Sequence, residues 1–144
     1  MKNHNQFNLF AAGILICLSA VLVNILFYST SQAFGAQYLV PLESNPTRNT
    51  PLPFLTVVIL TLAAAILATL LYGVLTKLTP GNILPPFISV VVTALLVSFG
   101  GPMEIPGASL QTRLLLSTMH VTAAAVILGG LLTYHFKFRA PFNK

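Results

Sequence analysis

Four long apolar stretches alternate with shorter polar segments along the chain, and each stretch has the length of a membrane-spanning helix. They cover about residues 9–28, 53–78, 84–99 and 110–136. A helix needs about 20 apolar residues to cross the hydrocarbon core of a bilayer. The pattern predicts an all-α fold, an integral membrane four-helix bundle, in which residues 1–144 form a single transmembrane domain.

Proline, glycine and serine mark the predicted helix ends. Pro53 suits the first turn of the second helix, because an amide there has no intrahelical partner. Gly100-Gly101-Pro102 is expected to end the third helix. Ser109 is the expected N-cap of the fourth helix. Residues 29–52 hold three prolines and are predicted to be a loop, in which Tyr38-Leu39-Val40 either lies on the membrane surface or covers the bundle.

Small residues recur at helical spacing and indicate faces for close helix contact. In the first helix, the side chains that share one narrow face are those of Gly13, Cys17, Ala20 and Asn24. Bulky residues on other faces are left for lipid or looser packing: Ile14, Leu18, Leu22 and Leu26. The predicted helix-packing positions of the second and fourth helices are Ala65, Thr69, Gly73, Ala125 and Gly129.

Composition agrees with this pattern and excludes other classes. Hydrophobic residues make up 56% of the chain and charged residues 6%, against about 25% charged in ordinary soluble domains. The net charge of +5 does not indicate a nucleic-acid partner, because the basic residues are scattered at the ends of apolar stretches. Cys17 is the single cysteine, so no intrachain disulfide forms.

Charge placement predicts how the chain is threaded. With four spans, the two termini and the turn near Lys77 share one side, and the basic residues there are Lys2, Lys77, Lys137, Arg139 and Lys144. The other side holds the basic residues Arg48 and Arg113 and both acids, Glu43 and Glu104. The positive-inside rule then places both termini in the cytoplasm, in a bacterial-type cell membrane. The first apolar stretch is expected to be a retained helix rather than a cleaved signal peptide, because it is long for a signal core.

His120 is the one ionisable side chain deep inside an apolar stretch, and ionisable groups at membrane depth usually face protein or water. By helical rise, His120 lies about 9 Å below Leu114, and Asn24 about 6 Å below the outer end of its own helix. Two interpretations remain open. A small outward-facing pocket would be lined by Asn24, Ser117 and His120, with Arg113 paired to Glu104 at its mouth. Alternatively, an interhelical hydrogen bond, for instance from Asn24 to His120, locks the bundle and binds nothing.

The sequence gives little support for a cofactor, a metal or a catalytic centre. His4 and His135 lie too far from His120 to share a haem iron with it, and two acids with one deep histidine cannot build a closed metal site. There is no nucleophile elbow, cysteine pair, HExxH motif or phosphate loop. No catalytic residue, cofactor or metal is therefore predicted.

A resemblance adds to this interpretation. Gly101-Pro102 after the third helix, followed by Met119-His120 in an alanine-rich last helix, resembles small four-helix bacterial membrane proteins grouped as a domain of unknown function. The resemblance implies a four-helix membrane fold and a role for Met119-His120, and it supplies no substrate.

The preferred functional prediction is a non-enzymatic membrane protein that packs against itself or acts as an accessory subunit of a larger membrane complex. Its predicted partners are the lipid bilayer and either other membrane subunits or further copies in a homo-oligomer. The alternative is a small-molecule or lipid-binding or permeation protein with the outward-facing pocket at His120. A third, weaker alternative is a membrane enzyme acting on a lipid-soluble substrate.

Overall fold

A computed structural model describes residues 3–42 and 45–138, and the side chains within 9–41 and 50–138. The helices are α1 (Asn3–Ala33), α2 (Phe54–Leu78), α3 (Leu84–Ser98), α4 (Gly100–Glu104) and α5 (Leu110–Phe138). The strands are β1 (Leu39–Leu42) and β2 (Asn45–Pro51). Of the charged residues used for the threading, Lys2, Glu43, Arg139 and Lys144 lie outside the described residues.

Within residues 3–42 and 45–138, four helical segments are long and apolar enough to cross a membrane, which confirms the predicted all-α membrane bundle. The segments are Leu9–Ala33, Phe54–Leu78, Leu84–Glu104 and Leu110–Phe138. The third consists of α3 and α4 together. Polar backbone groups inside a bilayer must be paired within the segment, and helices meet that requirement. At the junction of α3 and α4, the Phe99 amide donates to the Leu96 carbonyl and the Met103 amide to the Phe99 carbonyl.

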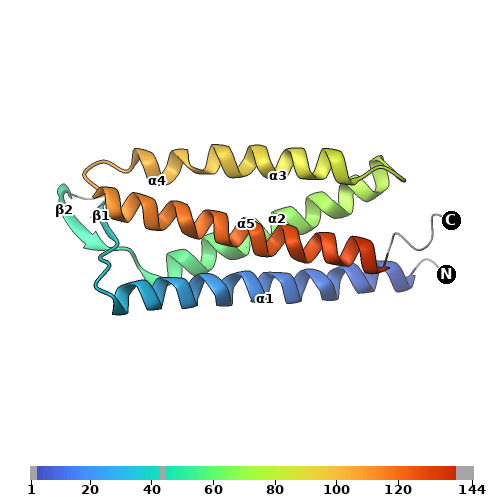
Figure 1. Cartoon of the computed structure of the whole chain (residues 1–144), viewed down its shortest axis with the longest axis horizontal. Helices are drawn as coiled ribbons and strands as arrows, with labels where there is room; N and C mark the ends of the chain where they lie inside the picture. The colour runs from blue at the N-terminus through green and yellow to red at the C-terminus, as the bar shows by residue number, and fades with distance from the viewer. Residues whose placement is uncertain (1–2, 43–44, 139–144) are drawn as a thin grey trace.

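The helices run up and down, and consecutive spans are antiparallel (Figure 1). Helix α1 makes its most extensive contacts with α5 and α2, whereas α3 packs on α5 and α2 at the side away from α1 (Figure 1). Helix α1 begins and α5 ends at the same end of the bundle, called the terminal end below. The two strands lie at the opposite end, called the hairpin end. The compartment that each end faces stays a prediction.

Helix α1 continues past the predicted end at Tyr28 to Ala33. The Ser31 hydroxyl donates to the carbonyls of Phe27 and Tyr28 at 2.8 and 2.9 Å, so it is hydrogen-bonded within its own helix. Gly35, at φ +88°, then reverses the chain, and its amide bonds the Gln32 carbonyl at 2.9 Å. A left-handed glycine is a common way to end a helix, because it has no Cβ to clash.

The prediction for Gly100-Gly101-Pro102 was partly wrong. Helix α3 does end just before it, at Ser98, but Gly100–Glu104 form the further short helix α4. Pro102 lies in the first turn of α4, where the missing amide hydrogen has no helical partner to lose. The predicted N-cap at Ser109 is confirmed, because its Oγ accepts the amide of Thr112 at 3.1 Å.

The predicted loop contains an antiparallel hairpin that closes one end of the bundle. Strands β1 and β2 pair with Leu39 opposite Pro51 and Val40 opposite Thr50. Tyr38, fully buried, stacks on Tyr28 of α1 at a ring distance of 4.8 Å. Of the two placements considered for residues 38–40, covering the bundle is the one observed at Tyr38.

The predicted contact face of α1 is confirmed. Gly13, Ala20 and Asn24 are buried, whereas the four bulky residues assigned to other faces are exposed: Ile14, Leu18, Leu22 and Leu26. The larger core cluster joins α1, α2, α3 and α5 through residues such as Ala20, Ala65 and Leu131. A smaller cluster at the hairpin end contains Tyr28, Tyr38 and Met119.

Two glycines set how closely α1 approaches its neighbours. A Cβ added at Gly13 would lie 2.7 Å from Cγ2 of Thr69 on α2. A Cβ added at Gly130 of α5 would lie 2.7 Å from Cγ1 of Ile16 on α1. Both neighbours are β-branched and therefore stiff at χ1, so neither has an easy route to make room.

Candidate functional site

Asn24 is buried inside the bundle and hydrogen-bonds across helices, although not to His120. Its Nδ2 donates to Oγ1 of Thr61 on α2 at 3.0 Å, and the Thr61 hydroxyl donates in turn to the Val57 carbonyl at 2.8 Å. The Oδ1 atom of Asn24 is buried and has no hydrogen-bond partner among the described residues. This pair ties α1 to α2 and leaves one acceptor unused.

His120 is half-buried on α5 and bonds within its own helix. Its Nδ1 lies 2.8 Å from the Leu116 carbonyl oxygen. Because a carbonyl can only accept, Nδ1 carries the proton, and in the neutral ring Nε2 is the acceptor. The imidazole is thereby oriented by backbone and not by a carboxylate.

Ser117 and Arg113 follow His120 toward the hairpin end of α5. Ser117 is buried, and its Oγ has no hydrogen-bond partner among the described residues. The Arg113 guanidinium donates from Nη2 to the Ile105 carbonyl at 3.1 Å rather than pairing with Glu104, whose side chain is exposed on α4. The Arg113 bond holds the turn between α4 and α5.

The predicted pocket residues are therefore only partly connected. Asn24 meets Thr61, and each of the α5 residues is held by its own backbone surroundings or left unpaired. Two clefts of the structure lie elsewhere and are lined by other residues. Within the described parts of the chain, no three histidine, cysteine or acidic side chains gather as they would around a metal ion.

The predicted helix-packing positions divide into two environments. Ala65 of α2 is fully buried, Thr69 meets Gly13, and Gly73 faces Leu9, whose Cδ2 would lie 3.5 Å from an added Cβ. On α5, by contrast, Ala125 and Gly129 are exposed. No atom lies within 4 Å of a Cβ built at Gly129.

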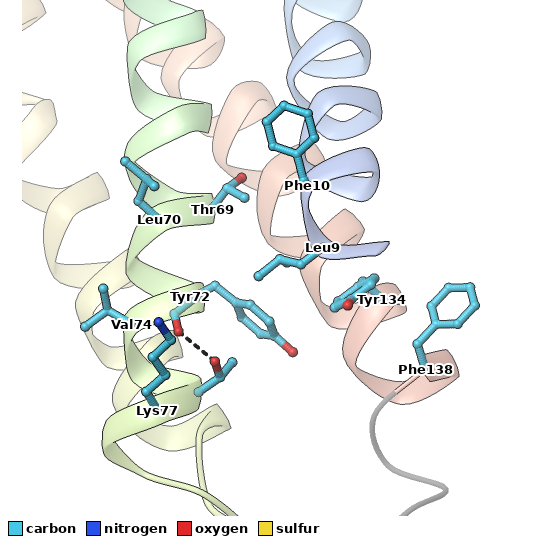
Figure 2. Close-up of a pocket in the computed structure, with 11 residues that line it drawn as sticks. Leu9, Phe10, Thr69, Leu70, Tyr72, Val74, Lys77, Tyr134 and Phe138 are labelled. Carbon is cyan, nitrogen blue, oxygen red and sulfur yellow. Dashed lines mark hydrogen bonds between the residues drawn. The ribbon is translucent and has the colours of Figure 1, made fainter. Parts of the chain in front are cut away.

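A cleft of about 480 Å³ opens at the terminal end between α1, α2 and α5 (Figure 2). Lys77 and Leu70 of α2 line one wall, Phe10 of α1 closes the side nearer the membrane centre, and Tyr134 and Phe138 of α5 stand opposite. A second cleft, of about 350 Å³, lies at the hairpin end beside α1 and the start of α5.

Tyr72 forms the floor of the terminal-end cleft, and the sequence analysis did not identify it. Its hydroxyl lies 3.0 Å from Nδ1 of His135, and its ring meets Phe87 and Tyr134 edge-on at 5.3 and 6.1 Å. The available signal was the position of Tyr72, Tyr134 and His135 near the C-terminal ends of the second and fourth predicted spans, which run in the same direction. That signal places the residues at one depth without showing that the helix faces meet.

Comparison with known proteins adds a family and no activity. The sequence pattern of a family of unknown function, DUF6069, matches residues 5–135. The predicted resemblance to a family without an assigned function is thus confirmed, while the bacterial origin implied by it stays a prediction. No curated protein and no solved structure matches the chain.

Proposed function

Because the chain belongs to the family of unknown function DUF6069, whose description assigns no activity, we propose its role from the geometry. The protein is a non-enzymatic membrane subunit that packs through α5 against a transmembrane helix of another chain. The observation that carries this proposal is an uncovered face of small residues on α5. We call it the α5 stripe, and it consists of Thr118, Thr122, Ala125, Gly129 and Thr133.

The described residues leave the α5 stripe exposed, whereas the small-residue face of α2 packs against other helices. The small residues of α2 are used internally, since Thr69 meets Gly13 of α1 and Ala65 is fully buried. Four of the five stripe residues are exposed, and Thr122 is half-buried. Figure 1 shows α5 crossing in front of α2, with α1 and α3 on its two sides.

The chemistry of the stripe suits a helix partner. The hydroxyls of Thr118, Thr122 and Thr133 donate to carbonyls one turn earlier in α5 at 2.9, 2.8 and 2.8 Å, so no hydroxyl donor of the stripe is left open to lipid. Gly129 and Ala125 let a second backbone approach closely, and close packing drives helix association in lipid, where no hydrophobic force acts between helices. The stripe therefore has small side chains whose hydroxyl groups are already hydrogen-bonded, and another helix can pack closely against it.

Cysteine cross-linking in native membranes tests this proposal. In a Cys17→Ser background, Gly129→Cys is expected to give a disulfide-linked dimer on mild oxidation, or a cross-linked product with a different polypeptide when a thiol-to-amine cross-linker is added. The mass of the product separates a second copy of the chain from a different subunit. Ala63→Cys, on an exposed face of α2, is the matched control and is expected to stay monomeric.

A bulky substitution gives an independent readout. Ala125→Leu should shift the particle purified in mild detergent to a smaller mass, while Ala63→Leu should leave the mass unchanged. Equal cross-linking at positions 129 and 63, or a monomer in native membranes with every variant, would rule out assembly through α5.

The second candidate function keeps the pocket near His120, and one observation favours it. Asn24 Oδ1 and Ser117 Oγ are buried without partners among the described residues, and a buried unpaired polar atom is unfavourable by about 1–3 kcal/mol. A small polar ligand or bound water would satisfy such atoms. Native mass spectrometry after gentle extraction is expected to show a small-molecule adduct that His120→Ala removes. Absence of any adduct in the unaltered protein counts against this candidate.

A further inference from the structure

The lining of the terminal-end cleft is apolar on the side nearer the middle of the bundle and charged at the terminal end. Phe10, Leu70 and Val74 line its apolar part and are all more than half exposed. Lys77 lines its end, two turns beyond Leu70 (Figure 2). Seven residues of helix span about 10 Å, which is less than half the thickness of a hydrocarbon core of about 30 Å. The Lys77 side chain turns back along α2, and its nitrogen lies beside Val74, so a cation adjoins the apolar wall within one cleft (Figure 2).

Charge at this end of the bundle is positive. Lys77 and Lys137 both lie here, on α2 and α5. Glu104, the one acid among the described residues, lies in α4 at the opposite end (Figure 1). A phosphate group near Lys77 therefore meets a cation and no competing carboxylate of the described chain.

The size and aromatic content of the cleft also suit an amphiphile. Its volume of about 480 Å³ falls within the usual range of about 300–1,000 Å³ for ligand pockets. Tyr72 and Tyr134 bring aromatic rings and hydroxyls to the same level, and tyrosine is favoured where headgroups meet hydrocarbon. A zwitterionic or neutral amphiphile would contact the apolar wall, but it carries no net negative charge to pair with Lys77.

We propose that this cleft binds one anionic phospholipid. The lipid phosphate lies beside the Lys77 ammonium, and one acyl chain runs along Phe10, Leu70 and Val74. The site is separate from the α5 stripe, so it holds whether or not the protein assembles with another helix. Lys77, which the sequence identified as a topology signal, thereby has a second role as the headgroup-recognising residue.

Native mass spectrometry of the full chain in a non-ionic detergent tests the proposal, with phosphatidylglycerol and phosphatidylcholine of the same acyl chains as probes. One phosphatidylglycerol is expected to stay bound at concentrations where phosphatidylcholine does not. Lys77→Gln should weaken phosphatidylglycerol binding about fivefold or more, since the lost charge faces an anionic headgroup. The matched control is Lys137→Gln, which removes the same charge from the same end of the bundle outside the cleft lining.

The apolar wall has its own matched pair. Leu70→Ala should weaken phosphatidylglycerol binding, whereas Leu67→Ala, on the same helix and similarly exposed but outside the lining, should not. All four side chains are exposed, so the variants are expected to fold.

Three results would overturn the proposal: equal binding of the two lipids, equal losses in Lys77→Gln and Lys137→Gln, or release of the lipid by millimolar inorganic phosphate. The first two outcomes identify Lys77 as a topology signal alone, and the third identifies a site for free anions. The oligomeric mass, read in the same spectra, reports separately on assembly through α5.

Discussion

Neighbouring residues in α5 face opposite surroundings, and this contrast gives the sharpest test of packing. Gly130 faces Ile16 of α1 so closely that an added Cβ would lie 2.7 Å from its Cγ1, whereas Gly129 faces open space. Both are helical glycines, so their substitution by alanine changes helix propensity by the same amount. The difference between the two variants therefore isolates the fit between helices.

Gly130→Ala is expected to lower the free energy of unfolding by about 1–3 kcal/mol, the usual effect of forcing an extra methyl into a packed core. Gly129→Ala is expected to leave the stability of the isolated chain unchanged or slightly raised. Unfolding of the purified protein in mixed detergent micelles measures both. Equal effects of the two substitutions would contradict the close contact between α5 and α1.

The Asn24–Thr61 bond is a second residue-scale test. A double-mutant cycle with Asn24→Ala and Thr61→Ala is expected to give a coupling free energy of about 0.6–1.7 kcal/mol, the range of interhelical hydrogen bonds in membranes. The control cycle pairs Asn24→Ala with His120→Ala, for which no direct bond exists and the coupling should be near zero. Coupling to His120 as large as that to Thr61 would show that the pairing is wrong.

The sequence predicts which residues of α1 are buried, but it does not predict which residues of the other helices they contact. Helical spacing places Asn24 on the face of Gly13 and Ala20, because that depends on α1 alone. Its partner depends on the rotation of α2 and α5 about their own axes, which no pattern within one helix determines. For that reason the bond from Asn24 to Thr61 does not follow from the sequence.

At the scale of elements, the helices were predictable and their connections were not. Long apolar runs determine the spans, but the hairpin of β1 and β2 arises from a proline-rich segment without strand alternation. Its placement depends on tertiary bonds. The Tyr28 hydroxyl donates to the Leu52 carbonyl at 2.7 Å, and Thr112 Oγ1 donates to the Gln37 carbonyl at 3.0 Å.

Tyr38 makes the attachment of the hairpin segment dependent on pH. Ser31 gives its one hydroxyl proton to helix carbonyls, so the Tyr38 hydroxyl is the donor in the 2.5 Å bond between them. Burial is the main cause that raises the pKa of Tyr38 above its usual value. The folded state therefore holds the phenolic proton more tightly than the unfolded state does.

The sign of the pH effect follows from that difference. The stability contributed by neutral Tyr38 is fully present below the unfolded pKa of about 10 and is lost as pH rises above it. Unfolding measured against pH should therefore show a steeper loss above pH ~10 in the unaltered protein than in Tyr38→Phe. Phenolate absorbance should also lose a late-titrating component in that variant. Superimposable curves would contradict the assignment.

At the scale of the whole molecule, the threading can be tested directly. In a Cys17→Ser background, Gln37→Cys at the hairpin end should react with a membrane-impermeant maleimide on intact cells. Asn82→Cys, exposed in the turn between α2 and α3, should react only after lysis, if the termini and this turn face the cytoplasm. The opposite labelling pattern would reverse the predicted orientation.

The extensive contact between α1 and α5 also determines when the larger core can assemble during synthesis. Helix α5 follows α1 in the chain with two spans between them, so the larger core cannot close until α5 has entered the membrane. Until then, the face of α1 that carries Ala20 has no α5 to cover it. A chain shortened before Leu110 is expected to leave that face open and to be degraded faster than the full chain, which a pulse-chase measurement in cells checks. Closure of the larger core therefore depends on α5, the later of the two helices to be made.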